Sequence, residues 1–154
     1  MTRSARSLVL LALALGGCGG GEPAEEPAAG SPEAPAAPAA TAADFAGSWD
    51  VVVVSEAGDT LPGHRLTATP DTTGWTMAFV DRPPMPVRVL AVAGDSVVTE
   101  FGPYESVVRP GVTVLTTVTH RRDADGLRGA LVARYSVTGP DSILRAYTEA
   151  RRAP

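Results

Sequence analysis

Apolar and polar residues alternate with a period of two along most of the chain from residue 44 to residue 152. In one run Trp75, Met77 and Phe79 fall on one face, while Thr76 and Ala78 fall on the other. A period of two places successive side chains on opposite faces of a β-strand, whereas an amphipathic helix repeats every 3.6 residues. The pattern predicts strands near residues 47–56, 63–69, 74–80, 86–93, 95–101, 104–109, 111–121, 127–137 and 141–151.

Short turn sequences separate these runs. Gly58-Asp59, Gly94-Asp95 and Pro110-Gly111 each stand between two of them. Glycine permits positive φ and Asp or Pro begins turns, so such pairs connect sequential strands as hairpins and favour an antiparallel meander. A meander of eight or nine strands leaves exposed edges unless it closes on itself. We therefore expect an all-β fold, a small antiparallel barrel, with a sandwich as the alternative.

The composition changes abruptly before residue 44. Residues 19–43 are almost entirely Gly, Pro, Ala and Glu. They contain too little apolar surface to offset the entropy of ordering, and recurrent proline favours extended segments. The sequence predicts a disordered linker over residues 18–43, followed by one barrel domain over residues 44–154.

The first residues differ again. A basic start with Arg3 and Arg6 precedes an apolar run over residues 8–15 and the tetrapeptide Leu15-Gly16-Gly17-Cys18. The run is far shorter than the roughly 20 residues that span a bilayer as a helix. The segment resembles the signal peptide and lipobox of bacterial lipoproteins. This resemblance implies removal of residues 1–17 and a lipid anchor on Cys18.

The neighbour of the cysteine bears on the location. In Gram-negative lipoproteins an aspartate after the cysteine commonly favours the inner membrane, and here that place is taken by Gly19. The resemblance therefore implies the outer membrane, at its periplasmic face or at the cell surface. The alternative is an ordinary signal peptide in which Cys18 is incidental. Cys18 is the only cysteine, so no disulfide framework exists.

The first predicted strand carries a second resemblance. The stretch Phe45-Ala46-Gly47-Ser48-Trp49-Asp50 is similar to the G-x-W motif of lipocalin-like barrels. In that family the tryptophan closes one barrel end and an arginine from the last strand packs across it. The resemblance implies this role for Gly47 and Trp49, with Arg145 or Arg151 as the arginine. The domain is shorter than a typical lipocalin and lacks its T-D-Y-like motif, so the resemblance concerns topology and does not name a ligand.

Motifs for catalysis and for metal binding are missing from the sequence. His64 and His120 are the only histidines, and no H-x-H, H-E-x-x-H or Cys/His cluster accompanies them. The serines form no G-x-S-x-G elbow, and no glycine-rich loop opens a helix. The formal net charge of −4 disfavours nucleic acid as a partner. We expect no enzymatic activity, no metal and no cofactor.

A binding interior is the functional hypothesis. The stripe Trp75, Met77 and Phe79, together with Tyr135, would line a pocket for a small apolar molecule if the barrel is wide enough. His120, Arg88 or Arg134 would then orient a polar head group. The alternative is that these side chains fill a small barrel, and that the domain is a non-catalytic scaffold or interaction module among envelope proteins.

Overall fold

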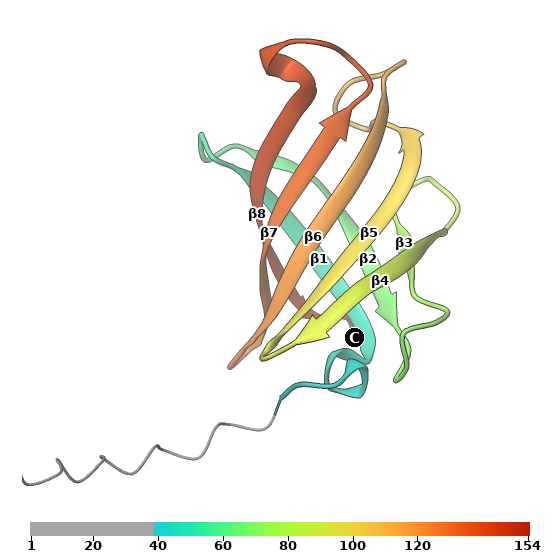
Figure 1. The fold of residues 1–154 in the computed structure, drawn as a ribbon, viewed down its shortest axis with the longest axis vertical. Helices are drawn as coiled ribbons and strands as arrows, with labels where there is room; N and C mark the ends of the chain where they lie inside the picture. Colours follow the sequence, from blue (N-terminus) through green and yellow to red (C-terminus); the bar gives the residue numbers. More distant parts are fainter. Residues whose placement is uncertain (1–38) are drawn as a thin grey trace, which may run out of the picture. The chain divides into compact units, whose positions relative to one another are not determined.

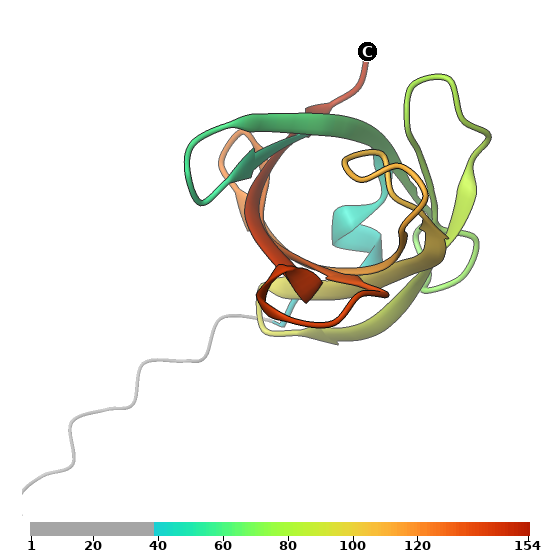
Figure 2. The ribbon, with the colours of Figure 1, turned by 90° about the horizontal axis from the view of Figure 1, so that it is seen from above.

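The computed structural model describes residues 39–154, so the predicted signal peptide, Cys18 and most of the predicted linker lie outside the described residues. Eight antiparallel strands follow one another around a closed barrel, and the last pairs with the first (Figures 1 and 2). The prediction of an antiparallel barrel is confirmed, and the sandwich is excluded. The strands are β1 (Gly47–Ser55), β2 (Thr60–Ala68), β3 (Thr76–Ala78), β4 (Met85–Ala93), β5 (Ser96–Glu105), β6 (Thr113–Asp123), β7 (Gly126–Tyr135) and β8 (Ile143–Arg152).

Two of the nine predicted strands are one strand. The runs 95–101 and 104–109 were separated by Gly102-Pro103, which reads as a turn. In the barrel, Phe101 pairs with Thr116 and Tyr104 pairs with Val114, so Gly102 and Pro103 form a bulge within β5. A bulge bends a strand without ending it. Residues 106–112, predicted to be partly strand, form the loop between β5 and β6.

The predicted strand over residues 74–80 is much shorter in the barrel. β3 keeps only Thr76–Ala78, and it pairs with β4 at just Thr76 and Met77. The chain then leaves the sheet through Asp81, which has a positive φ of 64°. Pro83 and Pro84 follow and cannot donate to a ladder. The barrel wall is therefore weakest between β2 and β4.

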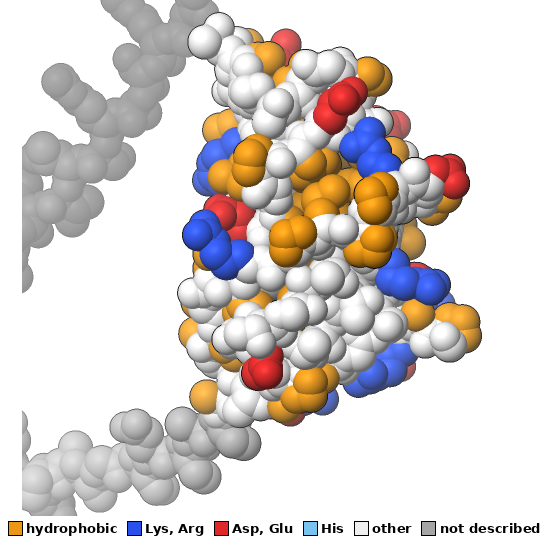
Figure 3. All heavy atoms as spheres, turned by 90° about the vertical axis from the view of Figure 1, so that its right-hand side faces the viewer, with side chains coloured by type: hydrophobic (Ala, Val, Ile, Leu, Met, Phe, Trp, Pro, Cys, Tyr) orange, Lys and Arg blue, Asp and Glu red, His pale blue; other side chains and the backbone are white. Residues whose placement is uncertain are grey.

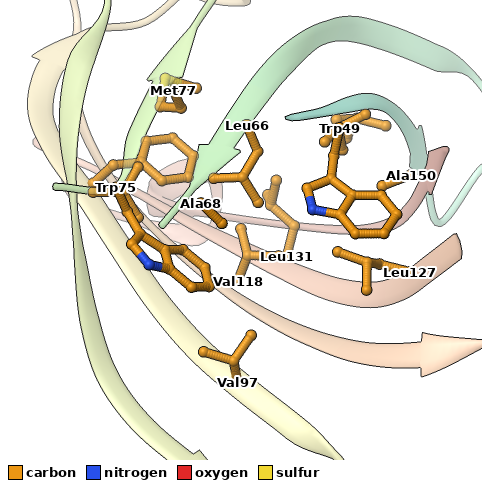
Figure 4. Close-up of a cluster of buried hydrophobic side chains, with 14 of the residues drawn as sticks. Trp49, Leu66, Ala68, Trp75, Met77, Val97, Val118, Leu127, Leu131 and Ala150 are labelled. Carbon is orange, nitrogen blue, oxygen red and sulfur yellow. The ribbon is translucent and has the colours of Figure 1, made fainter. Parts of the chain in front are cut away.

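The inward faces of the strands fill the half of the barrel nearest the start of β1. Trp75 and Met77 are each 1% exposed, and Val97 and Val118 are fully buried. Figure 4 shows these side chains packed with neighbours from β1, β2, β7 and β8. Close packing of this kind leaves no room for a ligand in this half.

A 3₁₀ helix, η1 (Ala42–Phe45), lies under this end of the barrel (Figures 1 and 2). The backbone N–H of Thr41 donates to the Asp44 carboxylate at 2.8 Å, which fixes the turn. Asp44 also forms an ion pair with Arg122 at 3.1 Å, and Phe45 is fully buried. η1 is therefore part of the closure of this barrel end, and it includes Ala42 and Ala43 as well as Asp44 and Phe45. A second 3₁₀ turn, η2 (Pro140–Ser142), precedes β8 at the other end.

Within residues 39–154, no helix has the length and apolar character needed to cross a membrane.

Candidate functional site: the open end of the barrel

The end of the barrel next to η1 is closed by Trp49. Its side chain is 4% exposed, and the indole N–H donates to the carbonyl oxygen of Phe45 at 2.8 Å. The guanidinium of Arg152 lies over the ring, 4.5 Å from its centroid, and donates to the carbonyl oxygen of Ala46 at 3.2 Å. Trp49 therefore has the structural role that the sequence predicted for it.

The arginine over Trp49 is Arg152, so the prediction of Arg145 or Arg151 was wrong. On β8 the inward positions are even-numbered, as the buried Ala146, Thr148 and Ala150 show. Arg145 and Arg151 are exposed on the outer face, whereas Arg152 continues the inward parity and pairs directly with Trp49. The period of two distinguishes inward from outward positions on β8. It does not tell which inward residue lies opposite Trp49, because that depends on the register between the first and last strands.

Two features of the structure favour glycine at position 47, its backbone conformation and the close approach of Arg152. Gly47 has a φ of 133°, which L side chains rarely adopt. A Cβ atom at this position would also collide with Nη1 of Arg152. Gly47 therefore leaves the space in which the guanidinium reaches Trp49.

Replacing Arg152 with alanine should lower the free energy of unfolding by about 1 kcal/mol, because it removes a cation–π contact and a main-chain hydrogen bond at a partly exposed site. Arg151→Ala is the matched control, since the side chain of Arg151 is next to Arg152 in sequence but faces outward. This substitution should change stability by less than about 0.5 kcal/mol. Urea unfolding of both variants measures the difference. Equal effects would contradict the assignment of Arg152.

The opposite end of the barrel holds a pocket. Its enclosed part measures about 40 Å³, and the hollow including the space open to solvent measures about 420 Å³. The loop between β5 and β6 bends over this opening when the barrel is seen from above (Figure 2). The lining comes from β1, β2, β5, β6, β7 and β8, from the β5–β6 loop and from Phe79 just after β3, and it is mainly apolar: Val53, Leu61, Pro62, His64, Phe79, Phe101, Tyr104, Ser106, Val107, Val108, Val114, Thr116, Leu131, Ala133, Tyr135 and Leu144.

Four rings form one side of this pocket. His64 lies 5.9 Å from Phe79 and 5.8 Å from Phe101, measured between ring centroids. Tyr104 stacks on Phe101 at 5.7 Å and also contacts Phe79 at 5.6 Å. Such separations are typical of favourable aromatic packing. The four rings make an apolar surface with one imidazole in it.

His64 and Tyr104, two titratable groups of the pocket, are uncharged at neutral pH. Burial lowers the pKa of His64 to about 4, because the apolar surroundings disfavour the imidazolium form. Burial likewise raises the pKa of Tyr104, whose hydroxyl lies 3.1 Å from Oγ1 of Thr116. The pocket therefore contains a few polar groups, and neither His64 nor Tyr104 among them is charged.

Two arginines hold the rim. Arg82 donates to the carbonyl oxygen of Glu105 at 2.6 Å. Arg109 lies over the ring of Tyr135, 4.3 Å from its centroid, and donates to the carbonyl oxygen of Asp141 at 2.6 Å. These contacts fasten the segment after β3 and the β5–β6 loop to their neighbours.

The β5–β6 loop has its own internal support. The hydroxyl of Ser106 accepts hydrogen bonds from the backbone N–H groups of Val108 and Arg109, at 3.1 and 3.0 Å. The backbone N–H of Gly111 donates to the Glu105 carboxylate at 3.0 Å. The loop thus covers the pocket as an ordered element, with Val107 and Val108 turned toward it.

His64 and Phe79 also face a hollow on the outer side of the barrel, beside β2 and β3. Val80, which is 83% exposed, lies in the same hollow. Figure 3 looks onto this side of the molecule and shows apolar side chains gathered between arginine and acidic ones. The two rings therefore separate the pocket from solvent where the wall is weakest.

Of the residues predicted to bind a ligand, Phe79 and Tyr135 line the pocket, whereas Trp75, Met77 and His120 do not. Trp75 and Met77 belong to the filled half of the barrel. Alternation along the strand correctly predicted that Trp75, Met77 and Phe79 face inward. It did not predict how far each lies from the open end of the barrel. Arg88 and Arg134 do not orient a head group either: both are exposed on the outer face, where Arg88 pairs with Glu100 and Arg134 contacts Thr117.

His120 is 2% exposed, and its Nδ1 atom has no hydrogen-bond partner within the described chain. The same holds for Oγ1 of Thr148. These residues flank Gly129, which pairs with both of them across β6, β7 and β8. His120 is therefore a buried interior residue beneath the pocket.

Sequence reasoning missed His64, Phe101 and Tyr104 as members of one cluster. The signal for His64 was present, because it shares its face with the buried Leu66 and Ala68. What the sequence lacked was the closure of the barrel, which brings β2 opposite β5. The covering loop was mistaken for strand.

No family model, curated protein or solved structure matches this chain. A search of residues 39–154 finds no group of three or more His, Cys, Asp or Glu side chains placed to hold a metal ion. The functional argument therefore rests on the geometry of the open end.

Proposed function

We propose that the barrel binds a small apolar molecule at its open end, and that a lipid on Cys18 holds it at the outer membrane of the cell envelope. The observation that carries the proposal is the contrast between the two ends. One end is closed by Trp49, Arg152 and η1, while the other holds an apolar pocket lined by four packed rings. Apolar pockets with a few polar groups at barrel mouths are common ligand sites.

The size of the pocket restricts the ligand. One water needs roughly 10–15 Å³ of enclosed volume, so the enclosed 40 Å³ holds only a few atoms. The wider hollow of about 420 Å³ includes space open to solvent, so most of it lies outside the enclosed volume. A ligand would therefore occupy the space under the β5–β6 loop and move Val107 and Val108 as it enters.

Filling the pocket should abolish binding. The uncharged dye N-phenylnaphthylamine, which fluoresces in apolar surroundings, should bind the purified protein, and Ala133→Leu should weaken its affinity by about tenfold or more. Ala133 is 5% exposed and lines the pocket, so a larger side chain takes the ligand's place. The matched control is Ala130→Leu on the outer face of the same strand, which should bind the dye normally. Dye binding that both variants retain would count against the pocket.

The proposed lipid anchor and membrane location have a separate test. Two or more acyl chains, at about 0.8 kcal/mol per buried CH₂, suffice for stable anchoring. Cys18→Ser should therefore eliminate incorporation of labelled fatty acid and release the protein from the membrane fraction. Retention of the label in the variant would rule out Cys18 as the acceptor.

A second candidate function is a scaffold or interaction module, and one observation favours it. Val52 and Tyr147 stand on the outer faces of the adjacent strands β1 and β8, and they are 49% and 60% exposed. Exposed apolar groups gathered on one face are a feature of interaction sites. A photo-crosslinker at residue 147 should capture a defined envelope protein that the same crosslinker at residue 88 does not. Equal capture at both positions would argue against this candidate.

A further inference from the structure

The pocket at the open end is built without charge. Among its lining residues in the described chain there is no Asp, Glu or Arg. The arginines of the strands that surround it, such as Arg134 and Arg145, are exposed on the outer face. An ionised group buried without a partner of opposite charge is strongly disfavoured. The interior therefore offers nothing to balance a carboxylate or an ammonium group.

One polar side chain in this lining has no partner of its own. His64 packs its ring against Phe79 and Phe101, and the imidazole lines both this pocket and the outer hollow beside β2 and β3. It takes part in none of the side-chain hydrogen bonds found within residues 39–154. Two of its polar neighbours are already engaged, since Tyr104 contacts Thr116 and Ser106 holds the covering loop. A neutral imidazole provides one N–H donor and one nitrogen acceptor. It can thus bind a hydroxyl, which both donates and accepts, or a carbonyl, which accepts.

We propose that the ligand is an uncharged molecule, an apolar chain or ring with one hydroxyl or carbonyl group, and that His64 binds this group. The inference rests on the proposed ligand-binding function and names the ligand class for the same pocket. The burial that keeps His64 neutral at pH 7 supports it.

Two arginines at the rim define the rival outcome. Arg82 and Arg109 already donate to main-chain carbonyl oxygens, and neither forms an ion pair with a carboxylate in the described part of the chain. A ligand with a carboxylate head would leave its tail in the pocket and bring its head to these guanidinium groups. In that case affinity would depend on the rim and not on His64.

The test compares octanol with octanoate as competitors of N-phenylnaphthylamine at about pH 7.5. Octanol should displace the dye at a concentration about tenfold lower than octanoate, because only the carboxylate must lose its hydration without compensation. His64→Leu should weaken octanol by about fivefold relative to the dye, since it removes one hydrogen bond that octanol makes. His64→Gln, which keeps a donor and an acceptor, should restore octanol binding.

The outcomes separate the two proposals. If the dye does not bind, the proposed function fails and the ligand class fails with it. If the dye binds but octanoate competes as well as octanol, the pocket is real and the uncharged ligand class is overturned. Loss of octanoate binding in Arg82→Gln or Arg109→Gln would then identify the rim as the head-group site. If His64→Leu leaves octanol unaffected, His64 is not the binding group.

Discussion

Lowering the pH from about 7.5 to about 4.5 reduces the free energy of unfolding of this protein by several kcal/mol. Burial lowers the pKa of His64 from 6.5 to about 4, and burial together with repulsion from His64 lowers that of His120 to about 4 as well. The folded protein keeps both rings neutral at pH values where the unfolded chain binds protons. Stability is therefore complete above about pH 6.5, declines as the pH falls, and stops declining near pH 4, where the folded protein also takes up protons. Each histidine contributes up to about 3 kcal/mol.

Urea unfolding at a series of pH values measures this dependence. His64 and His120 are the only histidines in the sequence, so no other side chain has its usual pKa between about pH 5 and pH 7.5. The carboxylates of Asp44, Asp71 and Asp95 have pKa values below 3.8 because hydrogen bonds stabilise their charged forms, and they act at lower pH.

Substitution assigns the effect to the two rings. His120→Leu should halve the slope of stability against pH, since one of two protons no longer binds on unfolding. Thr119→Val, on the exposed face next to it, should leave the slope unchanged. A slope that is the same in wild type and His120→Leu would show that His120 is not buried as a neutral ring.

Replacing Trp75 with alanine lowers the free energy of unfolding by about 3–5 kcal/mol. Its side chain is 1% exposed, and its indole N–H donates to the carbonyl oxygen of Asp71 at 2.7 Å. The substitution leaves a large cavity in the filled half of the barrel and removes this hydrogen bond. Trp75→Phe keeps most of the volume and should cost about 1–2 kcal/mol.

A stability control and a binding measurement distinguish a packing role for Trp75 from the predicted role in binding a ligand. Tyr147→Ala, at a side chain that is 60% exposed, should change stability by less than about 0.5 kcal/mol. Trp75→Ala protein at low temperature, where it is still folded, should retain the pocket at the opposite end and bind N-phenylnaphthylamine. Normal stability with lost dye binding would instead place Trp75 in the site.

The strands could be predicted from the sequence because alternation is a local property. Trp75, Met77 and Phe79 share a face whatever the rest of the chain does, since successive side chains on a strand point to opposite sides. Turn pairs such as Gly94-Asp95 marked the hairpins for a similar local reason. The same local reasoning failed at Gly102-Pro103, where a bulge and a turn have the same residue types and only pairing with β6 distinguishes them.

The candidate site was predictable only in part. Phe79 and Tyr135 were correctly placed on the inner face, and both line the pocket. The position of each inward residue along the barrel depends on strand tilt and register, which are long-range quantities, so Trp75 and His120 were assigned to a pocket that they do not line. His64, Phe101 and Tyr104 come together only because the barrel closes.

The sequence by itself determined the all-β class and the order of the strands, while resemblances to known families implied the closing role of Trp49 and predicted a lipid anchor at Cys18. Tertiary structure alone decided that Arg152 covers Trp49, that one half of the barrel is filled, and that the pocket at the other end carries His64 and no charge. The physical reason is the range of each property. Alternation and turn chemistry act between neighbours in the chain, whereas register and closure join residues as far apart as Trp49 and Arg152.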